Sequence, residues 1–338
     1  MFWRRRLGAV GCVAVLAAGL GGPSGRPASA AEPACRQEDE LAEAATLLLL
    51  RGTEPDPEAV LQALREARSD LPSAHALRLP GGGGQRLGRW LRRLRERADA
   101  PLVCGEAASE GVRLVLAAPR AGRLEDVPGG LRVHLARGFE APRIVLRDGA
   151  GTYRRLGSES GARVPLPDSL IRPVRAQLVA SGPAGPRPVA VRTIGEDRPD
   201  DPGEPEGRPG DGPLAERLAE LRALHGAGAL RPNRLLGEAA SDHAARVCRS
   251  GRVAHALEPG ADPEARLAHH HVRARVVGEV VARATDAAGA FDALLDSPSH
   301  RLTMIDDRFT DVGEGLAQRR GRACVVLLFA AWPRLVPR

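Results

Sequence analysis

A serine, a proline and a histidine stand together in the stretch DSPSHR, residues 296–301. Ser297 and Ser299 beside His300 are the residue types of a serine hydrolase, in which an imidazole activates a hydroxyl group. Serine followed by Pro298 is also a common helix start, with the serine as N-cap and the proline at the first helical position. Because a capping serine has its oxygen occupied and the sequence offers no recognisable oxyanion loop, we interpret the stretch as a helix start that carries His300 in its first turn.

Other histidines are also candidates for chemistry. The run His269–His271 would bind a metal ion if it were exposed, although a solvated helix end is the simpler interpretation. His243 lies close to Cys248 in a predicted helix, and we expect it to be partly buried there. The sequence contains no GxSxG, HExxH, Walker A or CxxC motif, so none of the enzyme classes marked by these motifs is indicated.

The N-terminus has the pattern of an export signal. Arginines at positions 4–6 precede an apolar run at 7–20 and small residues that end at Ala30. This predicts a signal peptide at residues 1–30 and a secreted or periplasmic chain. No later stretch approaches the roughly 20 apolar residues of a membrane-spanning helix, so no transmembrane anchor is expected.

Four cysteines follow the signal peptide: Cys35, Cys104, Cys248 and Cys324. An even number in an oxidising compartment predicts two disulfides, with three possible pairings. We expect Cys35 to pair with Cys104 and Cys248 with Cys324, because each pair then lies within one of the domains described below.

The charge is strongly basic, with a formal net charge of +7 and an isoelectric point near 10.2. All of the basic residues other than histidine are arginines, which is typical of a GC-rich genome. Scattered arginines are therefore weak evidence for phosphate binding, and an exported protein seldom meets nucleic acid, so no nucleic-acid partner is expected.

Residues 31–104 have helical patterning, with helices predicted over 37–50, 57–68 and 85–98. The third helix has leucines on one face and arginines on the other. We expect its leucines to pack on a core, and the alternative is that it lies on an anionic membrane surface.

Residues 105–195 alternate with a period of two, which predicts a small antiparallel β-sandwich. Its strands are predicted at 112–118, 131–135, 142–147, 175–181 and 187–194. Residues 196–213 are rich in proline, glycine and charge, which indicates a disordered linker.

Residues 214–338 form a separate unit of helices and paired strands. Helices are expected to end at Gly226 and near Gly251, and Thr285 or Asp286 is expected to cap another. The strands DVGEGLAQ and RACVVLLFAA are predicted to pair, with the second in the centre because it is apolar throughout. Helices and an antiparallel sheet within one unit predict an α+β fold.

The order of features in this unit resembles the CAP superfamily, in its bacterial exported form. This superfamily includes cysteine-rich secretory proteins, venom antigens and plant pathogenesis-related proteins. The matching segments are LLGEAASDHAARV, His255 in GRVAH, Arg266, Gly278-Glu279, SPSHR, FTDVGEGLA and VVLLFA. The resemblance covers the C-terminal third and implies an α-β-α sandwich.

The resemblance also implies a cleft in which two histidines and acidic residues face one another. Carried over by position, His255 and His300 would be ligands of a divalent metal ion, with Zn²⁺ expected, and Glu279 would be the carboxylate. The alternative for the histidines is that they only bind backbone carbonyls, and for Glu279 that it only pairs with an arginine.

Three departures from the family pattern weaken a catalytic assignment more than they weaken the fold. Val280 and Ser299 replace the usual asparagine and glycine, and Leu294 replaces a tryptophan. A second acidic residue of the site has no counterpart that we can place.

We therefore expect a secreted binding module for a lipid, cell-wall or protein ligand, possessing a His/Glu cleft. The alternative is a metal-assisted hydrolase or peptidase in which His255 and His300 hold the ion and Glu279 transfers the proton. A hydrolase needs an open metal position and an oxyanion donor, whereas a binding module needs only a shaped groove. In a third interpretation the C-terminal unit is a scaffold and the β-sandwich is adhesive.

Overall fold

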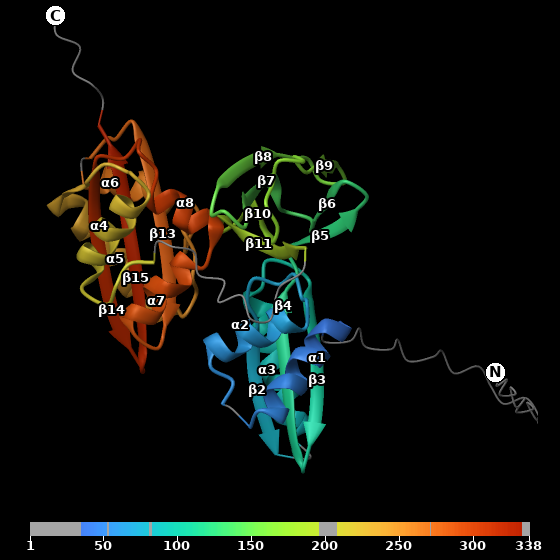
Figure 1. Cartoon of the computed structure of the whole chain (residues 1–338). Coiled ribbons are helices and arrows are strands. Elements are labelled where there is room, and N and C mark those ends of the chain that lie inside the picture. The colour runs from blue at the N-terminus through green and yellow to red at the C-terminus, as the bar shows by residue number, and fades with distance from the viewer. Residues whose placement is uncertain (1–34, 53, 81–82, 196–207, 271, 333–338) are drawn as a thin grey trace, which may run out of the picture. The chain divides into compact units, whose positions relative to one another are not determined.

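The computed structural model describes residues 35–52, 54–80, 83–195, 208–270 and 272–332 (Figure 1). The predicted signal peptide and most of the predicted linker, residues 196–207, lie outside these ranges. The described residues cluster as one compact unit, within which three successive regions each have their own hydrophobic core.

The first region, residues 35–119, is a four-stranded sheet with helices on both faces. Its sheet has the order β1-β3-β4-β2, in which β1 is parallel to β3 and the other pairs are antiparallel. Helices α1 and α2 share one core with Leu114 and Leu116 of β4, whereas α3 packs on the other face against Leu102 and Ala117. The elements are β1 (Arg36–Gln37), α1 (Asp39–Leu50), α2 (Pro57–Glu66), β2 (His75–Pro80), α3 (Gly84–Arg97), β3 (Leu102–Ser109) and β4 (Val112–Pro119).

This region corrects the prediction of a purely helical segment at residues 31–104. The three predicted helices are present, but β2 and the start of β3 lie in the same range. The predicted boundary after residue 104 falls inside β3, and the strand predicted at 112–118 pairs with β3 instead of joining the sandwich. Strand β2 escaped prediction because Leu79 is its only buried residue, so that it lacks a regular apolar alternation. The leucine face of α3 packs on a core as expected.

The second region is the predicted β-sandwich. Two sheets of order β11-β10-β7-β8 and β5-β6-β9 enclose one core that includes Leu131, Ile144 and Leu178. Its strands are β5 (Gly122–Val127), β6 (Gly130–Leu135), β7 (Glu140–Arg147), β8 (Tyr153–Gly157), β9 (Arg163–Pro165), β10 (Val174–Gly182) and β11 (Gly185–Ile194).

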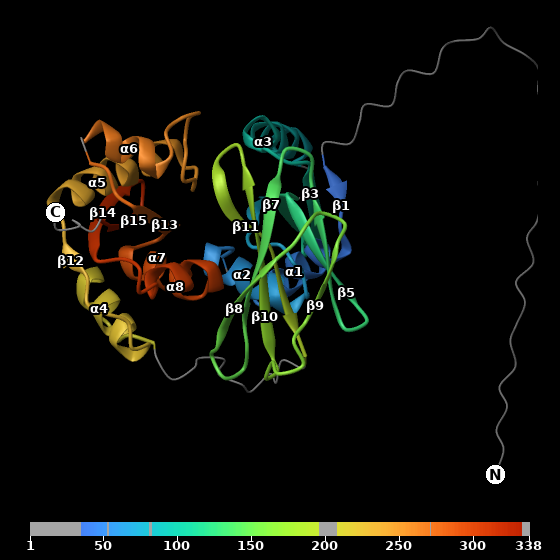
Figure 2. The ribbon, with the colours of Figure 1, turned by 90° about the horizontal axis from the view of Figure 1, so that it is seen from above.

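The third region is the predicted α-β-α sandwich. Figure 2 shows α5 and α6 on one side of the sheet and α7 and α8 on the other. The sheet has the order β12-β14-β15-β13, so the apolar strand β15 is central as predicted and is buried on both faces. Its elements are α4 (Leu214–Leu224), β12 (Arg231–Pro232), α5 (Arg234–Ser250), α6 (Pro263–His269), β13 (Val276–Ala284), α7 (Ala287–Leu295), α8 (Pro298–Met304), β14 (Asp311–Arg319) and β15 (Arg322–Ala331).

The helix ends of the third region follow the expected sequence signals. Gly251 ends α5 with a φ of +70°, a conformation that suits glycine, and the Asp286 side chain accepts the Gly289 N–H at the start of α7. Pro298 is the first residue of α8 as predicted. Ser297 precedes it, but its side chain makes no capping hydrogen bond within the helix.

The first and third regions have the same sheet topology. In both, a short strand parallel to the third strand is followed by two helices, an edge strand, a further helical segment and a hairpin. The first long helix also packs alike: a side chain at Gly105 would collide with α1 beside Leu41, and one at Gly313 would collide with α5 beside Leu236. These helices carry LAEAA at 41–45 and LGEAA at 236–240. The chain therefore contains two units built on one frame.

Both predicted disulfides are present. Cys35 is bonded to Cys104 in the first region, and Cys248 is bonded to Cys324 in the third, where the bond joins α5 to β15. Within the described ranges, no helix is long and apolar enough to cross a membrane.

Candidate functional site

A buried carboxylate lies at the centre of the candidate site. Glu279 is in β13, opposite Leu328 of β15, and its side chain is 1% exposed. Strand alternation turns Glu279 and Val281 towards α5 and α6, whereas Val280 and Ala282 join the core beneath α7. A charge at this depth requires partners, because an unpaired buried carboxylate is costly.

His255 and Arg266 supply these partners, one on each carboxylate oxygen of Glu279. Nδ1 of His255 donates to Oε1 of Glu279 at 2.8 Å, and Nη2 of Arg266 donates to Oε2. Arg266 lies in α6, and its Nη1 also donates to the carbonyl oxygens of His255 (2.6 Å) and Ala261 (2.7 Å). Arg266 thus fixes both the carboxylate and the loop that carries the histidine.

These partners keep Glu279 ionised. Burial alone would raise the pKa of the carboxyl group, but the hydrogen bond from His255 and the charges of His255 and Arg266 outweigh burial and lower the pKa. Both carboxylate oxygens are engaged, so Glu279 is an anchor for its neighbours.

His243 of α5 completes the inner side of the cluster. Its Nε2 donates to the carbonyl oxygen of Ala254 at 2.8 Å and lies 3.9 Å from Oε1 of Glu279. Burial lowers the pKa of His243 further than Glu279 raises it, and within the described part of the chain its Nδ1 has no hydrogen-bond partner. His243 is therefore a neutral imidazole that ties α5 to the loop before His255.

His300 lies in the first turn of α8. Its Nδ1 is buried and has no hydrogen-bond partner among the described residues. Burial and the charge of His255 lower the pKa of His300 to about 3, so the ring is neutral at physiological pH.

The β-sandwich covers the loop and helix that carry these histidines. The Ala256 N–H donates to the carbonyl oxygen of Ala184 in the β10–β11 turn at 3.1 Å. Gly185, with a φ of +90°, approaches so closely that a side chain there would meet Cβ of His255 at 3.2 Å. The turn thus lies directly against His255.

A glutamine from β10 takes over the role expected of Ser297 as helix cap. Oε1 of Gln177 accepts the N–H of Ser299 at 2.8 Å and the hydroxyl of Ser297 at 3.1 Å. Gln177 is buried, and its Nε2 lies 3.0 Å from Oγ of Ser297. The start of α8, and with it His300, is held by the sandwich.

The chain is similar to known proteins in its C-terminal part. The model of the cysteine-rich secretory protein (CAP) family matches residues 215–329. Residues 215–329 form a CAP domain. No curated protein matches the chain.

Several solved structures are similar to the chain. An outer surface protein from Borrelia burgdorferi has 22% identity and covers 36% of this chain and 90% of its own, with a TM-score of 0.34. An extracellular protein containing an SCP domain from Bacillus anthracis has 15% identity and a TM-score of 0.30, and the match covers 62% of this chain and 88% of that protein. A cysteine-rich secretory protein from Staphylococcus aureus has 15% identity and a TM-score of 0.28, and the match covers 62% of this chain and 66% of that protein.

Within the CAP domain, the structure brings His255 and Glu279 into a direct hydrogen bond, and the charge of His255 contributes to the lowered pKa of His300. In the part of the chain that the structure describes, no group of three or more His, Cys, Asp or Glu side chains could hold a metal ion. Of the His269–His271 run, residue 271 lies outside that part, and His269 ends α6.

Sequence reasoning assigned no role in the cluster to three of the residues that build it. Arg266 belonged to the matched segments, but its bond to Glu279 depends on how α6 packs. His243 could have been noticed as a histidine among the buried positions of α5. For Gln177 there was no signal, because it lies 120 residues from Ser297 in a different region.

Proposed function

We propose that the CAP domain is an extracellular binding module whose site is formed by His255 and His300, with Glu279 holding His255 in orientation. The observation that supports this proposal best is the engagement of both Glu279 oxygens by His255 and Arg266. Because Nδ1 of His255 donates to Glu279, its Nε2 is left to interact with a ligand.

The proposal includes a divalent metal ion held by these two imidazoles. A carboxylate that accepts the other N–H of a histidine is the usual outer partner of a metal-binding histidine, and Glu279 stands in that relation to His255. His300 has the neutral form that metal binding requires. When bound, Zn²⁺ would polarise a ligand oxygen. Two protein ligands leave further positions to water or ligand, so affinity would be modest.

The same geometry favours binding over the hydrolase alternative. A general base works best with a pKa near the operating pH and an oxygen free to take the proton. Glu279 has a lowered pKa and two bonded oxygens, which makes it a poor proton acceptor.

The proposed ligand is a lipid or another component of the cell envelope, and the proposed location is outside the cytoplasm. The two disulfides support the location, because such bonds persist in oxidising compartments.

Zn²⁺ titration of the full chain by calorimetry tests the metal proposal. His255→Ala and His300→Ala are each expected to remove the binding heat. His134→Ala is the matched control, because this exposed histidine pairs with Glu125 in the β-sandwich, away from the site. All four proteins should carry His269→Ala, His270→Ala and His271→Ala to suppress binding by the histidine run.

Equal heats in the site variants and the control would contradict the metal proposal and remove the hydrolase with it. The binding module without metal would then be tested with lipid vesicles, for which His255→Ala should weaken association and His134→Ala should not.

A further inference from the structure

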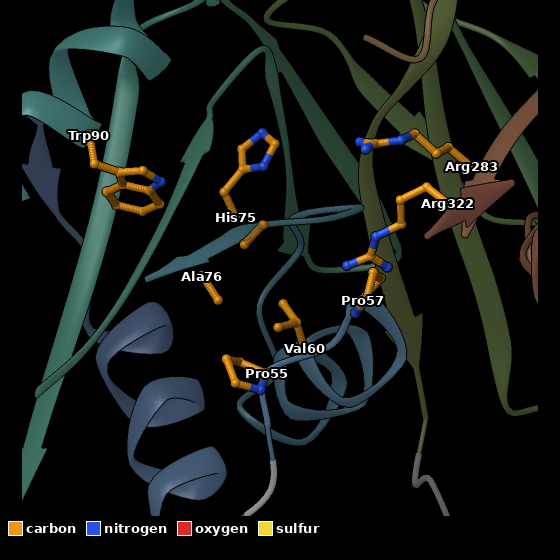
Figure 3. A pocket seen from close by; sticks show the side chains of 9 residues that line it. Pro55, Pro57, Val60, His75, Ala76, Trp90, Arg283 and Arg322 are labelled. Carbon is orange, nitrogen blue, oxygen red and sulfur yellow. The ribbon is translucent and has the colours of Figure 1, made fainter. Parts of the chain in front are cut away.

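A cavity of about 260 Å³ lies away from the histidine cluster (Figure 3). One wall comes from α2, β2 and α3 of the first region and includes Val60, His75 and Trp90. The other wall consists of Arg283 at the end of β13 and Arg322 at the start of β15. Pockets for drug-sized ligands start at roughly 300 Å³, so this cavity suits a smaller molecule.

The charge of this cavity is uncompensated. None of the residues that line it is acidic, and in the described part of the chain no carboxylate forms a salt bridge with Arg283 or Arg322. Nη1 of Arg322 is buried and has no hydrogen-bond partner, and the bond that Arg283 makes is a long one, 3.5 Å, to the carbonyl oxygen of Gly251. Burial and the charge of Arg322 lower the pKa of Arg283. Two guanidinium groups thus face one cavity that has no acidic side chain in its lining.

The opposite wall adds an aromatic surface and a neutral polar group. Figure 3 shows the indole of Trp90 and the imidazole of His75 across the cavity from the arginines. Desolvation and the charges of Arg283 and Arg97 lower the pKa of His75, which keeps the ring neutral and able to exchange one hydrogen bond with a ligand. Val60 and two prolines, Pro55 and Pro57, supply apolar surface.

We propose that this cavity binds a small oxyanion with a planar or apolar remainder. Arg283 and Arg322 would pair with the phosphate or carboxylate group, since guanidinium forks match such oxygens. The remainder would lie against Trp90 and Val60, with His75 bonded to a ligand oxygen. Both the first region and the CAP domain contribute to this site, and none of the residues that line it belongs to the histidine cluster.

Calorimetry of the full chain with three probes tests the site: inorganic phosphate, phenyl phosphate and benzoate. Phenyl phosphate is expected to bind more tightly than inorganic phosphate, because only the former uses Trp90. Benzoate distinguishes a carboxylate from a phosphate source. Arg283→Gln and Arg322→Gln should each weaken binding roughly 10- to 100-fold, the usual effect of removing a charge-assisted hydrogen bond.

Arg319→Gln is the matched control, because Arg319 is exposed and lies opposite Arg322 in the same hairpin without lining the cavity. Its binding should equal that of the unmodified chain. Quenching of tryptophan fluorescence by phenyl phosphate should disappear in Trp90→Phe, and thermal melting should show that every variant is folded. The proposal is overturned if no probe binds at millimolar concentration, or if Arg319→Gln weakens binding as much as Arg283→Gln.

Discussion

At the scale of single residues, the candidate site is organised by Glu279. This carboxylate binds a guanidinium on one oxygen and an imidazole on the other while nearly inaccessible to solvent. A buried pair of this kind adds little net stability compared with apolar residues, but removing one partner leaves the other charge buried and uncompensated. The neutral rings of His243 and His300 follow from the same burial.

Glu279→Gln should therefore be strongly destabilising. The amide cannot neutralise Arg266, so the free energy of unfolding, measured by urea denaturation, should fall by about 3–5 kcal/mol. Glu314→Gln is the control in the neighbouring strand β14, because burial raises the pKa of Glu314 and no cation among the described residues lowers it. The control should change stability little. A loss for Glu279→Gln no larger than that of the control would show that Arg266 is not dependent on the carboxylate.

His300 should make stability depend on pH. Its folded pKa of about 3 lies below the unfolded value near 6.5, so between these values the unfolded chain binds a proton that the folded chain does not. The contribution of His300 is complete above pH 6.5 and is lost as pH falls towards 3, with a slope of up to about 1.4 kcal/mol per pH unit.

His300→Gln should flatten this dependence in urea denaturation measured from neutral pH to pH 4.5. Because other histidines and carboxylates titrate in both proteins, the difference between the two curves is the quantity to compare. Parallel curves would mean that His300 is not desolvated in the folded chain.

At the scale of elements, α8 depends on a strand outside its own domain. The N–H of Ser299 in its first turn has no acceptor within the helix. It donates to the side chain of Gln177 in β10, which takes the place of a local cap. A short helix that begins with proline and has no side-chain cap of its own gains its fixed start from the sandwich.

Gln177→Ala should loosen this start. We expect a loss of about 1–2 kcal/mol in unfolding free energy, as for other lost caps, and faster hydrogen exchange of the α8 amides. Gln318→Ala, an exposed glutamine in β14, is the control. Unchanged exchange in α8 for Gln177→Ala would show that the helix start is held by other contacts.

At the scale of the whole molecule, the sequence predicted elements better than assembly. Helices α4, α5, α7 and α8 of the CAP domain were predicted from capping residues and apolar periodicity, and the disulfides from the division of the chain into domains. Strand β2 was missed because its pattern is weak, and the contacts of Gln177 and Arg266 depend on distant segments meeting. His255, Glu279 and His300 were found through family resemblance, since their spacing alone carries no periodic signal.

The repeated frame bears on why the ionic cluster exists. Strand pairing places Ala76 of the first unit, opposite Leu116, at the position that Glu279 holds opposite Leu328. Gly105 and Gly313 establish this correspondence. Gly105 pairs with Leu116 and lies beneath α1, and Gly313 pairs with Leu328 and lies beneath α5. The first unit thus forms this architecture with a methyl group at the position where the CAP domain buries and desolvates a carboxylate. The acid is therefore an addition to the shared architecture and is not required to form it.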